Sequence, residues 1–107
     1  MGALLAAAVL LSGLQGTVMK GPTMPVCRVG QPCSAAAQVT LVFRRAGRTY
    51  RTHSSADGRY RITLAPGYYT VSTVERIGII PNIRPAAVHV RTAHVDRLDF
   101  SIDTGIR

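Results

Sequence analysis

Histidine and serine side chains that are neighbours in the sequence are the first candidates for catalysis. His53 is followed directly by Ser54 and Ser55, which supplies a base and two potential nucleophiles. Successive side chains of a strand point to opposite faces, however, so these neighbours cannot form the hydrogen-bonded pair that nucleophilic catalysis needs. The nearby Asp57 belongs to a turn signal. We therefore expect no catalytic residues, and we expect that the protein is not an enzyme.

Histidines could also bind a metal ion, and this chain has three of them, His53, His89 and His94. They would form a site only if their strands converge, because a zinc site takes three or four ligands. The sequence places no carboxylate in a strand position beside them. We expect solvated histidines, and we predict neither a metal nor another cofactor.

The two cysteines lie in the segment PVCRVGQPC, as Cys27 and Cys33. Five residues separate them, which is wider than the Cys-x-x-Cys spacing of zinc sites, and the histidines are far away in sequence. Two cysteines this close in a loop rich in Gly and Pro normally pair in an oxidising compartment. We predict a Cys27–Cys33 disulfide; free thiols and a metal site are the alternatives.

Basic residues dominate the charge, since thirteen Lys and Arg face five Asp and Glu and give a formal charge of +8. One interpretation is a solvated surface that reflects a compositional bias towards arginine. The other is a site for an anionic partner such as a wall polymer, an acidic polysaccharide or a lipid head group. We do not expect nucleic acid, because no recognition helix or aromatic stacking platform is evident. The candidate anion-binding residues are Arg44, Arg59, Arg61, Arg91 and Arg97.

The N-terminal segment predicts the location of the protein. With 107 residues the chain has room for one domain. Residues 1–14 are almost wholly apolar and uncharged, but a membrane-spanning helix needs about 20 such residues. The length suits the hydrophobic region of a signal peptide, although its usual basic start is missing; a packed N-terminal helix is the alternative. We predict a signal-peptide-like segment, either complete or truncated at its start, over residues 1–13 and a secreted or extracytoplasmic domain over 14–107, with no stable transmembrane span.

After residue 14 the apolar residues alternate with polar ones, which is typical of strands in an all-β sandwich. Two turn signals stand out, Asp57-Gly58 for a type I′ hairpin and Ala65-Pro66-Gly67 for a type II turn. Residues 21–37 and 76–85 are expected to be loops. The seven predicted strands are 14–20, 39–44, 48–54, 59–64, 68–75, 86–91 and 95–102. Their expected inward residues include Val39, Leu41, Phe43, Tyr60, Ile62, Leu64, Tyr69, Val71, Ala86, Val88, Val90, Leu98, Phe100 and Ile102.

The segment SSADGRYRITLAPGYYTV, residues 54–71, resembles the carboxypeptidase regulatory-like domains. The matching positions are Asp57-Gly58, Tyr60, Ile62, Leu64 to Gly67, Tyr69 and Val71, and the family's Gly-x-Val and Ala-x-Val-x-Leu patterns match Gly16 to Val18 and Ala37 to Leu41. The resemblance implies a seven-stranded Greek-key β-sandwich of the prealbumin-like, carbohydrate-binding-like fold. The matched residues are turn and core residues, so they indicate a fold and carry no chemistry.

The resemblance also implies a non-catalytic, extracytoplasmic module of the kind attached to peptidases, adhesins and outer-membrane receptors. The loop with the two cysteines is longer than in that family. The C-terminal Tyr-Arg-Gly-Ser of transthyretin-like hydrolases is absent, since the chain ends in SIDTGIR. We expect a binding or structural module for anionic envelope glycans. The first alternative is an accessory subunit that docks to a secreted peptidase or surface protein, and the second is a metal-dependent or hydrolytic enzyme.

Overall fold

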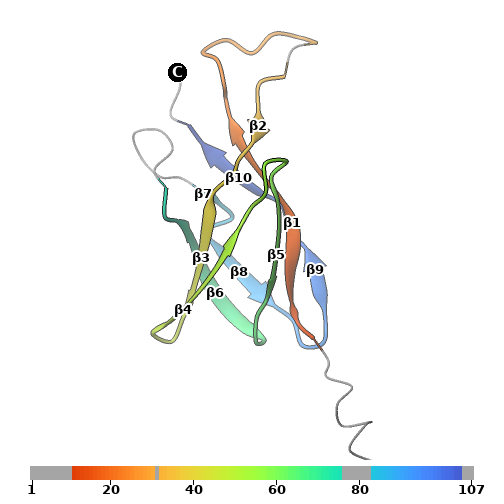
Figure 1. Ribbon diagram of the computed structural model, residues 1–107, viewed down its shortest axis with the longest axis vertical. Helices are drawn as coiled ribbons and strands as arrows, with labels where there is room; N and C mark the ends of the chain where they lie inside the picture. Colours follow the sequence, from red (N-terminus) through yellow and green to blue (C-terminus); the bar gives the residue numbers. More distant parts are fainter. Residues whose placement is uncertain (1–10, 31, 76–82, 105–107) are drawn as a thin grey trace, which may run out of the picture.

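The computed structural model describes residues 11–30, 32–75 and 83–104. These residues form two β-sheets and no helix, which confirms the all-β prediction (Figure 1). They contain ten strands where the sequence predicted seven, because two loops contain short strands and the last predicted strand is divided. The strands are β1 Gly13–Gly21, β2 Ala35–Ala36, β3 Thr40–Arg45, β4 Arg48–His53, β5 Arg59–Thr63, β6 Gly67–Thr73, β7 Ile83–Arg84, β8 Ala87–Val90, β9 Val95–Arg97 and β10 Phe100–Asp103.

The strand β1 organises the larger sheet, because its nine residues are long enough to pair with different strands along their length. The first part of β1 lies between β5, which is antiparallel to it, and β9, which is parallel. Its last part lies between β2 and β10, and β7 extends the sheet beyond β10. The second sheet has the order β4-β3-β6-β8 and is antiparallel throughout.

The core lies between the two sheets and is closed by aromatic rings from both. Phe43 of β3 meets Phe100 of β10 edge to face, with ring centroids 6.1 Å apart. Tyr60 of β5 packs against the same ring at 5.4 Å. Leu14 and Val18 of β1 are fully buried beside them. The alternation of the sequence identified Phe43, Tyr60 and Phe100 correctly, because each strand buries one of its faces.

The turn at Asp57-Gly58 does not form the predicted hairpin. The strand before it, β4, pairs with β3, and the strand after it, β5, pairs with β1, so the turn crosses from one sheet to the other. Of its two central residues only Gly58 has a positive φ, at 83°, whereas type I′ requires both. The Gly58 carbonyl accepts a hydrogen bond from the Val18 amide at 2.7 Å, which ties this turn to β1.

The Ala65-Pro66-Gly67 turn also connects strands of different sheets, since β5 pairs with β1 and β6 pairs with β3. Gly67 has a φ of 148°, far from the value near 80° that type II predicts for this position. The Tyr69 hydroxyl donates a hydrogen bond to the Ala65 carbonyl at 2.6 Å and so holds the turn against β6.

The predicted strand over residues 95–102 is divided into β9 and β10, which keep the same register along β1. The ladder is interrupted because the Thr17 amide donates to the Asp99 carboxylate, at 2.9 Å, and not to a backbone carbonyl. Leu98 is consequently only half-buried, although the alternation placed it inside, whereas Phe100 and Ile102 are buried as predicted.

Two other burial predictions are wrong. Ala86 precedes β8 and is exposed, while Val88 and Val90 face the core. The strand β3 was expected to be half-buried, yet Thr40 and Val42 on its outer face are also buried. Val42 is flanked on that face by the longer side chain of Arg51 and by Ser72, which are its register partners on the two neighbouring strands.

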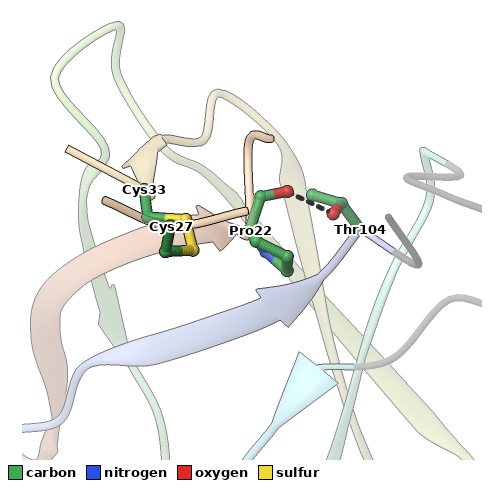
Figure 2. The surroundings of a disulfide bond; sticks show 4 residues. All are labelled: Pro22, Cys27, Cys33 and Thr104. Carbon is green, nitrogen blue, oxygen red and sulfur yellow. Dashed lines mark hydrogen bonds between the residues drawn. A yellow bond between two sulfur atoms is a disulfide. The ribbon is translucent and has the colours of Figure 1, made fainter. Parts of the chain in front are cut away.

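The segment between β1 and β2 carries the disulfide and lies at the end of the molecule opposite the β3–β4 turn (Figure 1). Cys27 and Cys33 are bonded as predicted, with their Cα atoms 5.5 Å apart. Figure 2 shows the bond beside Pro22, whose carbonyl accepts a hydrogen bond from the Thr104 hydroxyl at 2.6 Å. The Thr23 amide donates to the Cys33 carbonyl at 2.9 Å, so a backbone hydrogen bond also closes this loop.

The two predicted loops are only partly irregular. Residues 21–37 contain β2, which pairs with Met19 and Lys20 of β1. Residues 76–85 contain β7, while positions 76–82 lie outside the described residues. None of the described residues belongs to a helix long and apolar enough to cross a membrane.

Candidate anion-binding site

All five arginines predicted to bind anions are exposed, but the structure gathers only three of them. Gln15 of β1 has Arg61 of β5 as its register partner on one side and Arg97 of β9 on the other. Arg59 lies beside Thr17 in the next outward row. We call these three arginines the β5–β9 face. Its shallow hollow is lined by Gln15, Gly16, Thr17, Arg59, Tyr60 and Arg97.

Two aspartates share this face and reduce its charge. Asp57 lies 3.4 Å from the Arg59 guanidinium, and Asp99 lies 3.5 Å from that of Arg97. A hydrogen bond from Ser55 holds the pKa of Asp57 below its usual range, with a contribution from Arg59. The Thr17 amide, and then Arg97, lower the pKa of Asp99. Three guanidiniums minus two carboxylates leave a single positive charge on the β5–β9 face.

The other two predicted arginines lie apart from this face. Arg91 follows β8 and forms a bidentate pair with Asp96, with its Nε 3.0 Å and its Nη2 2.5 Å from the two carboxylate oxygens. This pairing lowers the pKa of Asp96 and raises that of Arg91. Arg44 lies on β3 in the other sheet. The five predicted arginines therefore lie in three separate environments. Of these five, only Arg44 and Arg61 have no carboxylate partner among the described residues.

A second arginine cluster, which the sequence reasoning missed apart from Arg44, lies on the β3–β4 hairpin. It consists of Arg44, Arg45, Arg48 and Arg51, and we call it the hairpin cluster. Arg45 and Arg48 are register partners next to the turn, and Arg44 and Arg51 share the outer face of the sheet as diagonal neighbours. A shallow hollow over the turn is lined by Arg44, Arg45, Ala46, Gly47, Arg48, Thr49 and Thr70.

Among the described residues, no carboxylate pairs with an arginine of the hairpin cluster. All five acidic residues of the chain lie within the described ranges, and three of them pair with Arg59, Arg91 and Arg97. Glu75 accepts hydrogen bonds from Thr40, and Asp103 is the register partner of Gly21 near the disulfide end. Four guanidiniums without a carboxylate partner therefore leave four positive charges on one hairpin. In this respect the hairpin cluster is a stronger candidate for an anion site than the β5–β9 face.

Arg45 differs from the other three arginines because its position is fixed by packing. Its guanidinium lies over the Tyr69 ring, 5.9 Å from the centroid, which is within the range of a cation–π contact. A side chain at Gly67 would collide with this guanidinium, so the glycine provides the space for it. Arg44, Arg48 and Arg51 make no ion pair with any described residue and are exposed.

A simple feature of the sequence could have identified the hairpin cluster. Residues 21–56 contain no Asp or Glu, although they contain five of the arginines. The candidate arginines were chosen by strand alternation, without regard to the acidic residues nearby. That choice left out Arg45, Arg48 and Arg51. The distribution of acidic residues along the chain is the better signal, because the strength of an anion site depends on the net local charge.

The residues with catalytic potential have structural partners. Ser54 is 2% exposed; its hydroxyl donates to the Ala37 carbonyl at 2.5 Å and accepts from the Val39 amide at 2.8 Å. The Thr40 hydroxyl lies 3.0 Å from the Glu75 carboxylate and 2.9 Å from Nδ1 of His53. The Thr40 amide also donates to Glu75 at 2.7 Å and lowers the pKa of that carboxyl group. These contacts fasten the end of β6 to β3.

The other two histidines lie at the opposite end of the molecule from the disulfide loop. His89 is on β8, and Nδ1 of His94 lies 2.8 Å from the Thr92 carbonyl in the following turn. Asp96 lies close enough to both histidines for their charge to affect its pKa, but both of its oxygens already bind Arg91. Within the described ranges, no three His, Cys, Asp or Glu side chains are arranged to hold a metal ion.

Comparison of the chain with family models, with curated proteins and with solved structures gave no match.

Proposed function

We propose that this protein is a non-catalytic module that binds anionic polymers through the hairpin cluster. The observation that carries the proposal is the absence of any carboxylate partner for Arg44, Arg45, Arg48 and Arg51 among the described residues, while three arginines elsewhere are paired. Guanidinium groups bind carboxylate, sulfate and phosphate through parallel hydrogen bonds, and several on one rigid hairpin can engage successive groups of a polymer.

An extracytoplasmic location is part of this proposal. It is supported by the Cys27–Cys33 disulfide, which persists in oxidising compartments, and by the apolar segment at residues 1–13. Such a location would place the module among charged envelope glycans. The prealbumin-like, Greek-key relationship that the motif at residues 54–71 suggests belongs to the proposal too, and such modules are non-catalytic.

Retention on immobilised dextran sulfate, with neutral dextran as the blank, tests the proposal. We expect the protein to bind only the sulfated matrix and to elute at moderate salt, since screening weakens contacts between exposed charges. The double variant Arg48→Ser/Arg51→Ser should elute at clearly lower salt than the wild type. The matched control, Arg59→Ser/Arg61→Ser, removes the same formal charge from the β5–β9 face and should shift elution less. Equal shifts for the two variants would show that net charge alone governs retention, and the hairpin cluster would then not be the site.

A further inference from the structure

The outer face of the four-stranded sheet carries an exposed aromatic ring. The chain has four Tyr and two Phe, all within the described ranges, and of these six only Tyr68 is exposed, at 75%. Its ring stacks on His89, with centroids 4.3 Å apart and planes 15° from parallel. The two residues are register partners on β6 and β8. The fold thus leaves this large ring exposed, while stacking on His89 holds it in one orientation.

The stacking decides which side of the ring remains available. The strand β6 lies between β3 and β8, and His89 on β8 covers one side of the Tyr68 ring. The other side therefore faces β3, where the turn residues Ala46 and Gly47 carry no bulky side chain. The free side of the ring is thus open above the β3–β4 hairpin.

Two guanidiniums of the hairpin cluster lie on the same face as this ring. Arg44 is the register partner of Thr70, which is two residues from Tyr68 on the same side of β6. Such diagonal neighbours are about 7–8 Å apart, within reach of long side chains. Arg51 lies one row further on, beside Val42, and Thr49 and Thr70 are the register partners of Arg44 on the two neighbouring strands. We call Tyr68, Arg44 and Arg51, with these two threonines, the Tyr68 face.

The combination on the Tyr68 face fits one class of ligand. The C–H side of a pyranose ring is apolar and packs against an aromatic face, while its hydroxyls bind hydroxyl and guanidinium groups. A carboxylate on the same sugar would reach Arg44 and pair with it through two hydrogen bonds. A polyanion without sugar rings would use the arginines but leave the ring of Tyr68 unused.

We propose that the Tyr68 face binds acidic pyranose units, that is, uronate residues of a polysaccharide. The inference rests on the proposed function and assigns a substrate class to it. Single-stranded nucleic acid also offers stacking rings and negative charge, but it is normally bound by several aromatic side chains that stack successive bases, and this face presents one. The sequence pattern showed no aromatic platform; the pairing of β6 with β8 creates this one by bringing Tyr68 and His89 together.

The test compares affinities of the whole chain for four probes by NMR titration or calorimetry. The probes are a short oligogalacturonate, polyglutamate of similar charge, a neutral maltooligosaccharide and a short single-stranded oligonucleotide. We expect the wild type to bind oligogalacturonate more tightly than polyglutamate, and the neutral sugar weakly. Tyr68→Leu should lower the affinity for oligogalacturonate about threefold to tenfold, since aromatic packing of this kind contributes about 0.5–1.5 kcal/mol. It should leave the affinity for polyglutamate unchanged.

The controls separate this inference from the proposed function. Arg44→Ser should weaken binding of oligogalacturonate and polyglutamate alike, while Val74→Ala changes an exposed apolar residue at the other end of β6 and should change neither. If Tyr68→Leu keeps the wild-type preference for oligogalacturonate, or if the oligonucleotide binds more tightly than the uronate, the Tyr68 face is not a uronate site. Failure of the wild type to bind any of the anionic probes would instead overturn the proposed function.

Discussion

The carboxylate of Asp57 lies 3.4 Å from the guanidinium of Arg59, in the turn that carries the chain from one sheet to the other. Both side chains are exposed, so this pair adds little to stability. The pair matters for charge, because Arg59, which the sequence predicted as an anion-binding residue, is already paired with a nearby carboxylate. The same holds for Arg97 with Asp99 and for Arg91 with Asp96.

Releasing Arg59 from this pair should strengthen anion binding. Asp57→Asn keeps an acceptor oxygen for the Ser55 hydroxyl and removes the negative charge, so we expect the variant to elute from dextran sulfate at higher salt than the wild type. Glu75→Gln is the matched control, because it removes one negative charge from a carboxylate that binds Thr40 and pairs with no arginine among the described residues. An equal gain in the two variants would contradict a local effect of the Asp57–Arg59 pair.

The disulfide should matter for its own loop more than for the fold. The bond joins cysteines six positions apart, and closing so short a loop contributes about 2 kcal/mol in the chain-entropy model. The large buried core residues, such as Phe43 and Phe100, lie outside this loop. We expect reduction to lower the free energy of unfolding in urea by about 2 kcal/mol or less and to leave the chain folded. Loss of the cooperative transition on reduction would show that the loop supports the core.

Acid should weaken the attachment of β6 to β3 through Glu75. Hydrogen bonds from Thr40, first from its amide and then from its hydroxyl, lower the pKa of Glu75 in the folded protein. A lowered folded-state pKa means that the stabilisation is present above the unfolded pKa, near 4.3, and is lost as the pH falls through the folded value. Urea unfolding between about pH 7 and pH 3 should therefore show a smaller acid loss for Glu75→Gln than for the wild type. Thr40→Ser, which keeps the hydroxyl, should retain the wild-type dependence, and identical curves for all three proteins would exclude a contribution from Glu75.

Gly47 and Gly58 have nearly the same positive φ but different surroundings. Substituting each by alanine therefore separates the cost of backbone strain from the cost of a steric clash. Gly58 has φ of 83° and Gly47 has φ of 77°. An added Cβ at Gly47 would meet nothing within 4 Å, but at Gly58 it would lie 2.6 Å from the Val18 carbonyl oxygen. Gly47→Ala should cost only the left-handed strain, about 1–2 kcal/mol. Gly58→Ala should cost more, measured by thermal or urea unfolding, because β1 would have to shift. Equal losses would mean that the Gly58 turn moves freely away from β1.

Much of the fold could be predicted from the sequence because alternation and turn residues are local properties. The positions of Tyr60, Tyr69 and Phe100 in the core follow from the period of two, since each strand buries one face. The Cys27–Cys33 pairing was likewise predictable, because a gap of six positions places both cysteines in one loop. The exposure of Arg44 on β3 and of Arg59 and Arg61 on β5 follows from the same period.

Strand partners, by contrast, were decided only by the tertiary structure. The Asp57-Gly58 motif looks like a hairpin turn, yet β5 pairs with β1, because pairing depends on distant residues that compete for the same strand edge. The division of residues 95–102 likewise depends on the Asp99 side chain taking the Thr17 amide.

The same distinction between local and tertiary information applies to the candidate site. Alternation shows that an arginine is exposed, but it cannot show whether a carboxylate from another strand lies beside it, as Asp96 does for Arg91. Nor can it show that the pairing of β6 with β8 places His89 against Tyr68. Exposure is set by the local period of the chain, whereas charge balance and stacking are set by which strands become neighbours.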